Sequence, residues 1–381
     1  MRKRQVMFML SAIAYIVWCF PLVSYAQDKP EEKVFEEPVF TIVHQVEMSS
    51  VKSQGSTGTC WCFGTTSMIE SEIMRLGNGQ VGISEMFSVR NLFSDKADQY
   101  LRFHGTSNFE QGGAQHDVMT AIKKYGMVPR EVYPGLNYGS ETHSHGEIVS
   151  VLKGVVQNVM KNRNGVISPV WKEGFSGILD AYFGENPTEF NYEGKLYTPQ
   201  SFATESGINP DDYVEFSSYT HHPFYEEFVL EVPDNWAQKY MYNIPVDDLM
   251  RIVDNALEKG ISISWAADIS GLNYASGVGL IPAEGEDAKN LMAAEKEISQ
   301  DDRQYMFDHY QLTDDHCMHI IGVATDQNGK KYYIEKNSWG EGGKYKGFSY
   351  MSDSFMRMRT MSVMVHKDAV PERLARKIGL K

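Results

Sequence analysis

Hydrophobic residues recur at helical spacing just after a polar, glycine-rich stretch near the N-terminus. Ile69, Ile73 and Leu76 lie three or four positions apart, and Gly77 follows them. Residues on one face of a helix have this spacing, and glycine is common just past a helix end. The pattern predicts a helix that begins at or near Cys60.

Two strand-like runs near the C-terminus flank a short loop with an Asn-Gly pair at 328–329, which is typical of tight hairpins. Side chains alternate between the faces of a strand, so the loop length decides which residues share a face. A loop of two or four residues places His316 on the same face as Asn337, and the four-residue loop sets Asn337 opposite Met318. A loop with an odd number of residues selects His319 instead.

Other stretches predict elements by the same reasoning. We expect a helix over 249–256 followed by a buried strand over 261–267, and a partly helical segment around 147–162. We expect loops near 184–197 and an exposed helix face over 288–298.

The first 26 residues have the layout of a secretory signal peptide. Three basic residues at 2–4 precede an apolar run over 6–20, and small residues lead to Ala26, where cleavage is expected. An uncleaved anchor is the alternative, but the run is short for a membrane span of ~20 residues. We expect an exported protein, periplasmic or secreted, with a domain over 27–381 and no stable membrane insertion after removal of the leader.

The composition excludes several classes of protein. With 381 residues, 42% of them hydrophobic and 23% charged, the chain buries a sizeable core, which excludes disorder and collagen-like repeats. Lys and Arg number 36 against 50 Asp and Glu, a net charge of −14. Loss of the three basic leader residues leaves 33 against 50, or −17. Such a surface repels phosphate backbones, so we expect no nucleic-acid partner.

Three cysteines follow the leader, namely Cys60, Cys62 and Cys317. An odd number in an oxidising compartment leaves at least one thiol unpaired or paired between chains. At a helix start, backbone N–H groups and the helix dipole stabilise a thiolate, so we expect a lowered pKa and a nucleophilic role for Cys60. Gln54 is placed to donate to a developing oxyanion. The alternatives are a small core cysteine, a solvated glutamine, and either two packed thiols or a bridge for the remaining cysteines.

A thiolate nucleophile needs a base and acid partner. With an even hairpin loop, the Asn337 carboxamide accepts a hydrogen bond from one imidazole nitrogen of His316 and leaves the other nitrogen for the Cys60 sulfur. Trp339 would then shield this hydrogen bond from water.

These residues carry a resemblance to a known family. Gln54 followed by Cys60-Trp61, then Asp315-His316, then the run 337–340, resembles the papain superfamily of cysteine peptidases, peptidase family C1. The Cys-to-His spacing of 256 residues exceeds the ~130 to 150 of papain-like chains. That spacing is similar to the bleomycin hydrolase and aminopeptidase C branch. Further similar segments are 112–113, 125–129, 232–236, 242–245 and 303–316.

The resemblance implies an α+β, two-lobed papain-like fold with a large insertion at about 138–225. A helical half would carry Cys60 at a helix N-terminus, and a β-barrel-like half would carry His316 and Asn337. By the resemblance Cys60 is the nucleophile, His316 the base and acid, Asn337 the orienting residue and Gln54 the oxyanion donor. No metal or organic cofactor is required, and a peptide is the expected partner.

The resemblance also sets the expected function, an exported cysteine peptidase that acts as an aminopeptidase of the bleomycin hydrolase type. Members of that branch form hexamers and lay a C-terminal arm in the cleft, so a homo-oligomer is among the expectations, and 371–381 resembles the helix before that arm. The alternatives are a papain-like endopeptidase, a silent peptide- or glycan-binding protein on the same scaffold, and acyl transfer to an amine.

Two histidine pairs are candidate metal ligands, His143 with His145 and His221 with His222. No cysteine or clustered carboxylate in the sequence completes a site around either pair, and so we interpret all four as solvated loop histidines.

Overall fold

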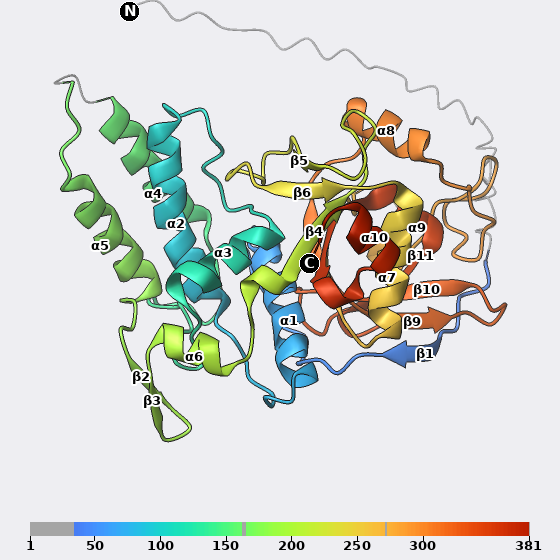
Figure 1. Ribbon diagram of the computed structural model, residues 1–381, viewed down its shortest axis with the longest axis horizontal. Coiled ribbons are helices and arrows are strands. Elements are labelled where there is room, and N and C mark those ends of the chain that lie inside the picture. Colours follow the sequence, from blue (N-terminus) through green and yellow to red (C-terminus); the bar gives the residue numbers. More distant parts are fainter. Residues whose placement is uncertain (1–33, 162–164, 271–272, 381) are drawn as a thin grey trace, which may run out of the picture. The chain divides into compact units, whose positions relative to one another are not determined.

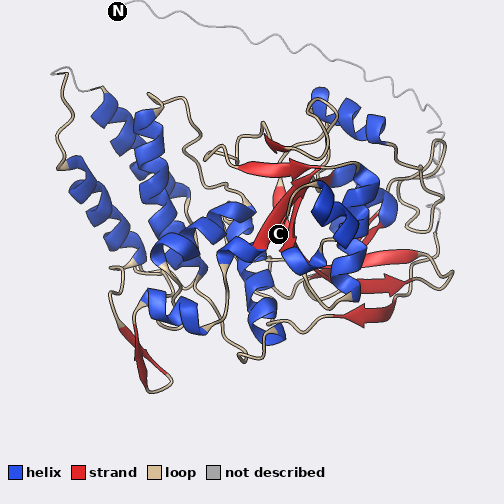
Figure 2. Ribbon diagram, viewed as in Figure 1, coloured by secondary structure: helices blue, strands red, loops and turns tan. Residues whose placement is uncertain are grey.

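Most of the longer helices come in the first half of the described chain, and most of the strands come in the second half (Figure 2). The computed structural model describes residues 34–161, 165–270 and 273–380. The signal peptide expected over 1–26 lies outside the described residues. Within the described ranges, every helix is too short or too polar to cross a bilayer.

The helices and strands have the following bounds. The helices are α1 (Cys60–Arg75), α2 (Glu85–Arg102), α3 (Gln115–Tyr125), α4 (Gly146–Met160), α5 (Trp171–Phe183), α6 (Pro199–Glu205), α7 (Val246–Glu258), α8 (Gln300–Asp308), α9 (Asp353–Arg359) and α10 (Glu372–Lys377). The strands are β1 (Thr41–Gln45), β2 (Phe190–Tyr192), β3 (Lys195–Tyr197), β4 (Tyr213–Ser217), β5 (Glu227–Val229), β6 (Tyr240–Asn243), β7 (Ile263–Ala267), β8 (Val278–Gly279), β9 (His316–Thr325), β10 (Lys331–Lys336), β11 (Phe348–Ser352) and β12 (Thr360–His366).

One large mixed sheet organises the second half. Its strand order is β5-β6-β4-β12-β7-β9-β10-β11-β8, and β1 also pairs with β9. The pairs β4 with β6 and β11 with β8 are parallel, and the others are antiparallel. This arrangement places β9, which begins at His316, in the middle of the sheet.

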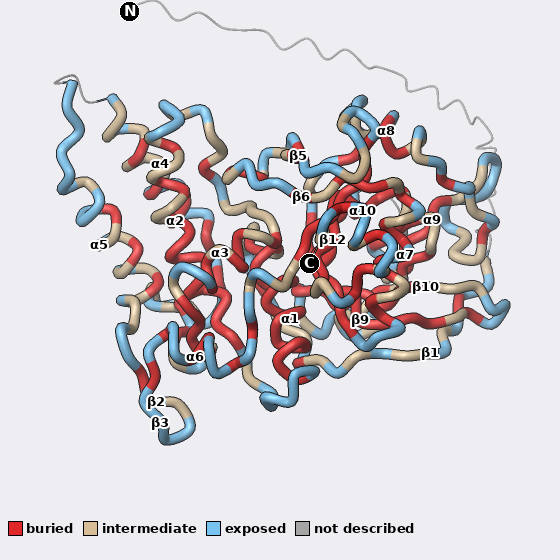
Figure 3. Tube along the Cα trace, viewed as in Figure 1, coloured by how far each residue is buried: buried red, intermediate tan, exposed pale blue. Residues whose placement is uncertain are grey.

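Helix α1 joins the helical part to the sheet. In Figure 1 it lies between the helices α2 to α6 and the strands β9 and β10, and it contacts α2, α3, β7 and β9. Its residues from Trp61 to Met74 are all buried, as Figure 3 shows along its length. A side chain at Gly64 would come within 2.8 Å of the Cys317 carbonyl oxygen. The absence of a Cβ at this position therefore allows the start of α1 to pack directly on β9.

The β9–β10 hairpin has neither of the two even loop lengths that place His316 with Asn337 in the sequence analysis. Thr325 pairs with Lys331, so the loop has five residues, an odd number. A β-bulge then shifts the register, because Gly322 pairs with Ile334 whereas Ile320 pairs with Glu335. The extra residue on β9 restores the register of the four-residue loop, and that register extended by one residue sets Asn337 opposite Met318.

The remaining sequence-based elements have mixed outcomes. Helix α7, strand β7 and helix α4 confirm three of them. The expectation of loops near 184–197 is wrong in part, because β2 and β3 form a hairpin there. The expected helix over 288–298 is also wrong, because the chain forms turns and a bridge between Pro282 and Glu295. The interval 138–225 contains α4, α5, β2, β3 and α6, and also β4, which pairs with β12.

Candidate active site

Cys60 is the first residue of α1, as the sequence predicts. The turn before it is held by Thr57, whose hydroxyl donates to the Gln54 carbonyl at 2.9 Å. Gln111 fixes the turn from the neighbouring loop, because its Oε1 accepts from the Gly58 N–H at 2.7 Å. Its carbonyl oxygen accepts from the Trp61 indole at 2.9 Å. These contacts hold the start of the helix in place without a side-chain cap.

The electrostatic environment of Cys60 differs from the sequence expectation. Burial raises the pKa of its thiol to about 12, although hydrogen bonds with the backbone of Cys317 and Trp61 act in the opposite direction. The expected depression of this pKa is therefore wrong, because desolvation outweighs the hydrogen bonds at the helix start. The contact with the backbone of Cys317 also places the sulfur beside the first residues of β9.

His316 and Asn337 meet as the register predicts. The distance between His316 Nε2 and Asn337 Oδ1 is 2.9 Å, and both residues are buried. The Ser338 N–H donates to Asn337 Oδ1 at 2.7 Å, which identifies that atom as the amide oxygen. His316 Nε2 is therefore the donor, and Nδ1 keeps a lone pair in the neutral ring. Burial lowers the pKa of His316 to about 4, so the imidazole is neutral at pH 7.

Two polar residues behind Asn337 escaped the sequence analysis. Asn337 Nδ2 donates to the Tyr274 hydroxyl at 2.7 Å, and that hydroxyl donates to Glu335 Oε2 at 3.1 Å. Glu335 is fully buried, which raises its pKa to about 8. Tyr274 lies in a short 3-10 helix, Asn273–Ser276, far from Asn337 in the sequence, so no spacing in the sequence connects the two.

Trp339 covers the histidine, as the sequence analysis expects. Its ring stacks on the His316 imidazole with centroids 4.7 Å apart and an interplanar angle of 25°. The indole is itself 55% exposed, so its outer face is open to a bound molecule. A cavity of about 270 Å³ begins beside it and extends between Tyr274 and Gly347.

Gln54 is buried rather than solvated, and its amide is oriented by two hydrogen bonds. Ser338 Oγ donates to Gln54 Oε1 at 2.6 Å, and Gln54 Nε2 donates to the Thr57 carbonyl at 2.6 Å. A primary amide has two N–H groups, so one remains for a further acceptor. The Ser338 contact also ties the loop before α1 to the residue that follows Asn337.

The three cysteines of the described chain are free thiols. Cys62 Sγ donates to the Glu85 carbonyl at 3.3 Å, and Cys317 Sγ lies 3.4 Å from Ser264 Oγ. Both residues are buried, so the packed-thiol alternative for Cys62 and Cys317 is confirmed over the bridge.

The interpretation of His143 and His145 as solvated loop residues is wrong, because both side chains are buried. Burial lowers the pKa of His145 to about 3, and neither of its ring nitrogens has a hydrogen-bond partner among the described residues. The ring instead packs edge-on against Phe183, with centroids 5.3 Å apart. It is therefore a neutral histidine within the core of the helical part.

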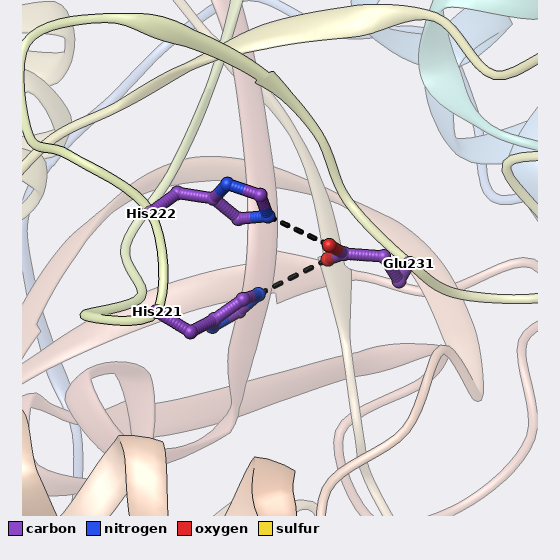
Figure 4. Close-up of side chains that lie close together, drawn as sticks. All are labelled: His221, His222 and Glu231. Carbon is purple, nitrogen blue, oxygen red and sulfur yellow. Dashed lines mark hydrogen bonds and ion pairs between the residues drawn. The ribbon is translucent and has the colours of Figure 1, made fainter.

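The second histidine pair does have a nearby carboxylate, which the sequence analysis missed. Figure 4 shows His221 and His222 pointing at Glu231, with Nε2-to-oxygen distances of 3.0 and 2.6 Å. Gln304 Nε2 lies 3.0 Å from His221 Nδ1, and Gln304 Oε1 accepts from the Thr220 N–H at 2.6 Å. That orientation makes Nδ1 an acceptor, so the proton sits on His221 Nε2 and faces Glu231. His221, His222 and Glu231 offer ligand atoms within 4.8 Å of one another, and a metal ion would have to displace the proton on His221 Nε2 to bind there.

Two family models match consecutive segments of the chain. The model described as papain family cysteine protease matches residues 41–172, which include Cys60. The model described as Peptidase C1-like family matches residues 179–380, more than half of the chain, which include His316 and Asn337. The chain belongs to the Peptidase C1-like family. It is a papain-superfamily cysteine peptidase, and the expected resemblance is confirmed.

Curated relatives agree with this family. The peptidase is 23% identical to aminopeptidase C of Lactobacillus delbrueckii subsp. lactis over 390 residues, which cover 91% of this chain and 85% of the relative. It is 23% identical to bleomycin hydrolase of Mus musculus over 388 residues, covering 88% and 84%.

A solved structure has the same fold. The crystal structure of PepW from Lactobacillus rhamnosis matches the C1-like peptidase with a TM-score of 0.70 at 19% identity, over 89% of this chain and 84% of that one. The expected α+β class, with helical and sheet parts, is confirmed.

Proposed function

We propose that this cysteine peptidase is exported and removes residues from the free amino terminus of peptides, with Cys60, His316, Asn337 and Gln54 in the roles set out above. The hydrogen bond between His316 Nε2 and Asn337 Oδ1 carries the proposal. It fixes the tautomer that a general base for a neighbouring thiol needs, with a lone pair on Nδ1.

The first step is attack of the Cys60 sulfur on the scissile carbonyl carbon. Because burial raises the pKa of Cys60 and lowers that of His316, the resting pair is a neutral thiol and a neutral imidazole. The thiol proton moves to His316 Nδ1 as the carbon–sulfur bond forms. The resulting imidazolium donates through Nε2 to Asn337 Oδ1, which stabilises the charge.

The tetrahedral intermediate carries its negative charge on the former carbonyl oxygen. The free N–H groups at the start of α1 and the remaining N–H of Gln54 are the donors for that oxygen. His316 then gives its proton to the leaving amine as the carbon–nitrogen bond breaks. Water, activated by the same imidazole, hydrolyses the acyl-enzyme and restores the thiol.

Two observations support the choice of substrate. The 23% identical relatives that span most of the chain carry the name aminopeptidase C, so removal of N-terminal residues is the reaction proposed here. The cavity beside Trp339 and Tyr274 offers an apolar surface on the side of His316, where the leaving part of a peptide would lie.

The basic start, apolar run and small residues of 1–26 support export.

The nucleophile is tested by covalent labelling with an epoxide that alkylates thiols. We expect Cys60→Ala to lose both labelling and turnover. The matched control is Cys62→Ala, which removes a buried thiol two residues further along the same helix and should keep both. Labelling that persists in Cys60→Ala and disappears in Cys62→Ala would contradict the assignment.

The position of cleavage is tested by mass spectrometry of the products from one unblocked peptide and its N-acetylated copy. Release of single residues from the unblocked peptide alone is the expected result. Internal cuts in both peptides would establish an endopeptidase, and the absence of Cys60-dependent cleavage would establish a silent scaffold.

A further inference from the structure

A carboxylate that the mechanism does not use lies in the active-site region. A side chain at Gly112 would come within 2.0 Å of Asp234 Oδ1, so this carboxylate rests directly on the glycine backbone. Gly112 follows Gln111, which binds the start of α1 through Gly58 and Trp61. The glycine therefore brings the Asp234 carboxylate close to the helix that carries the nucleophile.

The effect of the Asp234 charge on the Cys60 thiol agrees with this placement. Among the carboxylates that raise the pKa of the Cys60 thiol, Asp234 acts more strongly than Asp315, which directly precedes His316. Coulomb interactions weaken with distance and with solvent exposure. The Asp234 carboxylate therefore lies on the glycine next to Gln111, the residue that binds the start of α1, and its charge acts on the Cys60 thiol.

No cationic side chain of the described residues lies within ion-pair distance of Asp234. Its backbone N–H donates to Asp314 Oδ2 at 2.7 Å, and Asn108 Nδ2 lies 3.5 Å from its Oδ1. The nearby ammonium group of Lys96 donates to the carbonyl oxygens of Glu110 and Gly112 instead. Lys96 attracts the Asp234 carboxylate from a distance and lowers its pKa, but burial and the Asp314 charge outweigh this attraction. A cation that joined the two carboxylates directly would therefore stabilise them.

We propose that Asp234 binds the α-ammonium group of the first residue of the substrate and so restricts the enzyme to free amino termini. The inference rests on the proposed function, because it assigns the residue that would select the substrate of that reaction. Asp314, which accepts from the backbone of Asp234, positions the loop that carries it.

The distance from the scissile carbonyl carbon favours the α-ammonium group over the ammonium group of a basic side chain. In a peptide whose first bond is cut, the α-nitrogen is two bonds from the carbonyl carbon that Cys60 attacks, about 2.5 Å away given the standard bond lengths. The ammonium group of a lysine side chain is several bonds further along a flexible stem. The Asp234 carboxylate acts on the Cys60 sulfur itself, so it suits the α-ammonium group, which is nearer to the carbonyl carbon that this sulfur attacks.

The charged and titratable groups around Asp234 predict a distinctive pH profile. Three charged groups act on the pKa of Asp234, namely Lys96 on α2, Asp117 on α3 and Asp314 before β9. The Asp234 charge in turn raises the pKa of Cys60 on α1. Burial and the Asp314 charge raise the pKa of Asp234 to about 7. Cleavage of an unblocked substrate should therefore fall as the pH drops through about 7. Cleavage of a blocked substrate should persist until His316 is protonated near pH 4.

The experiment compares kcat/KM for an aminoacyl-coumarin amide, its N-acetyl form and its des-amino form. Wild-type enzyme should prefer the free amine, and Asp234→Asn should lower that preference by roughly 10- to 100-fold, the range of a charge-assisted hydrogen bond. The matched control is Asp315→Asn. Asp315 also carries a charge that raises the pKa of Cys60, but it is Asp234, and not Asp315, that rests on Gly112. The control variant should leave the ratio between free and blocked substrates unchanged.

Each outcome decides the inference. An unchanged ratio in Asp234→Asn, an equal loss in Asp315→Asn, or a preference for blocked peptides with a basic second residue would overturn it. If Asp234→Asn does not fold, the wild-type enzyme decides, because equal cleavage of the amino and des-amino substrates also overturns it. Loss of all Cys60-dependent cleavage in the wild-type enzyme would instead overturn the proposed function.

Discussion

Tyr274 connects two buried polar residues that lie more than sixty positions away from it in the chain. Its hydroxyl accepts from Asn337 and donates to Glu335, so the carboxamide that faces His316 is held from behind. The ring also meets Trp339 edge-on, with centroids 6.0 Å apart. Tyr274 thus orients Asn337 without contact to His316 in this network.

We expect Tyr274→Phe to lower kcat by about 2- to 10-fold with little change in KM, which corresponds to one neutral hydrogen bond of roughly 0.5–1.5 kcal/mol. The matched control is Tyr345→Phe, at the far side of the same cavity. The pH profile of kcat separates positioning from damage to the fold, because a freed Asn337 should shift the acid limb, which a purely structural defect would leave in place.

Asp234 also has a cost for stability that can be measured. Its folded-state pKa of about 7 lies above the ordinary value of 3.8, so between these pH values the folded protein holds a proton that the unfolded chain releases. Stability therefore falls as the pH rises toward 7 and stays low above it. Asp234→Asn should raise the melting temperature at pH 8 and leave it nearly unchanged at pH 4. A lower melting temperature at pH 8 would refute this account.

At the scale of elements, the site depends on the contact between α1 and β9. The pattern of Ile69, Ile73 and Leu76 was enough to predict α1 and its start at Cys60. The pairing of His316 with Asn337 was also predicted, but its physical basis was not. The loop has five residues, and a bulge opposite β10 restores the register. A bulge depends on packing between strands, and no short-range pattern in the sequence indicates it.

Gly64→Ala tests the contact between α1 and β9. Because the new methyl group would meet the Cys317 carbonyl at 2.8 Å, we expect a loss of about 1–3 kcal/mol in unfolding free energy and slower epoxide labelling of Cys60. The control is Gly174→Ala, an exposed position in α5 with open space around it, which should gain up to ~1 kcal/mol. Chemical denaturation measures both. Equal effects in the two variants would show that close packing is not the cause.

At the scale of the whole molecule, three buried histidines make stability depend on pH. Burial lowers the pKa of His145 to about 3 and that of His316 to about 4, and His319 is lowered well below its ordinary value. The unfolded chain binds protons at these positions below about pH 6.5, whereas the folded protein does not. Stability should therefore fall as the pH drops below 6.5, by up to ~1.4 kcal/mol per pH unit for each group.

His145→Leu should weaken this dependence, because it removes a buried ring whose two nitrogens lack partners among the described residues. The gain in unfolding free energy should be larger at pH 5 than at pH 7. His309→Leu, at an exposed position, is the control and should leave the slope unchanged. A slope that is the same in His145→Leu and wild type would show that His145 is already protonated in the folded state.

Cys60, the proposed nucleophile, and His316, its proposed base, lie 256 residues apart in the chain, and they fall in different family-model matches. A ribosome that has made Cys60 must complete another two thirds of the polypeptide before β9 and β10 exist. Until then Cys60 lacks both its proposed base and the residue that orients that base. If Cys60 and His316 act as proposed, the order of synthesis delays proteolysis until the last strands are in place.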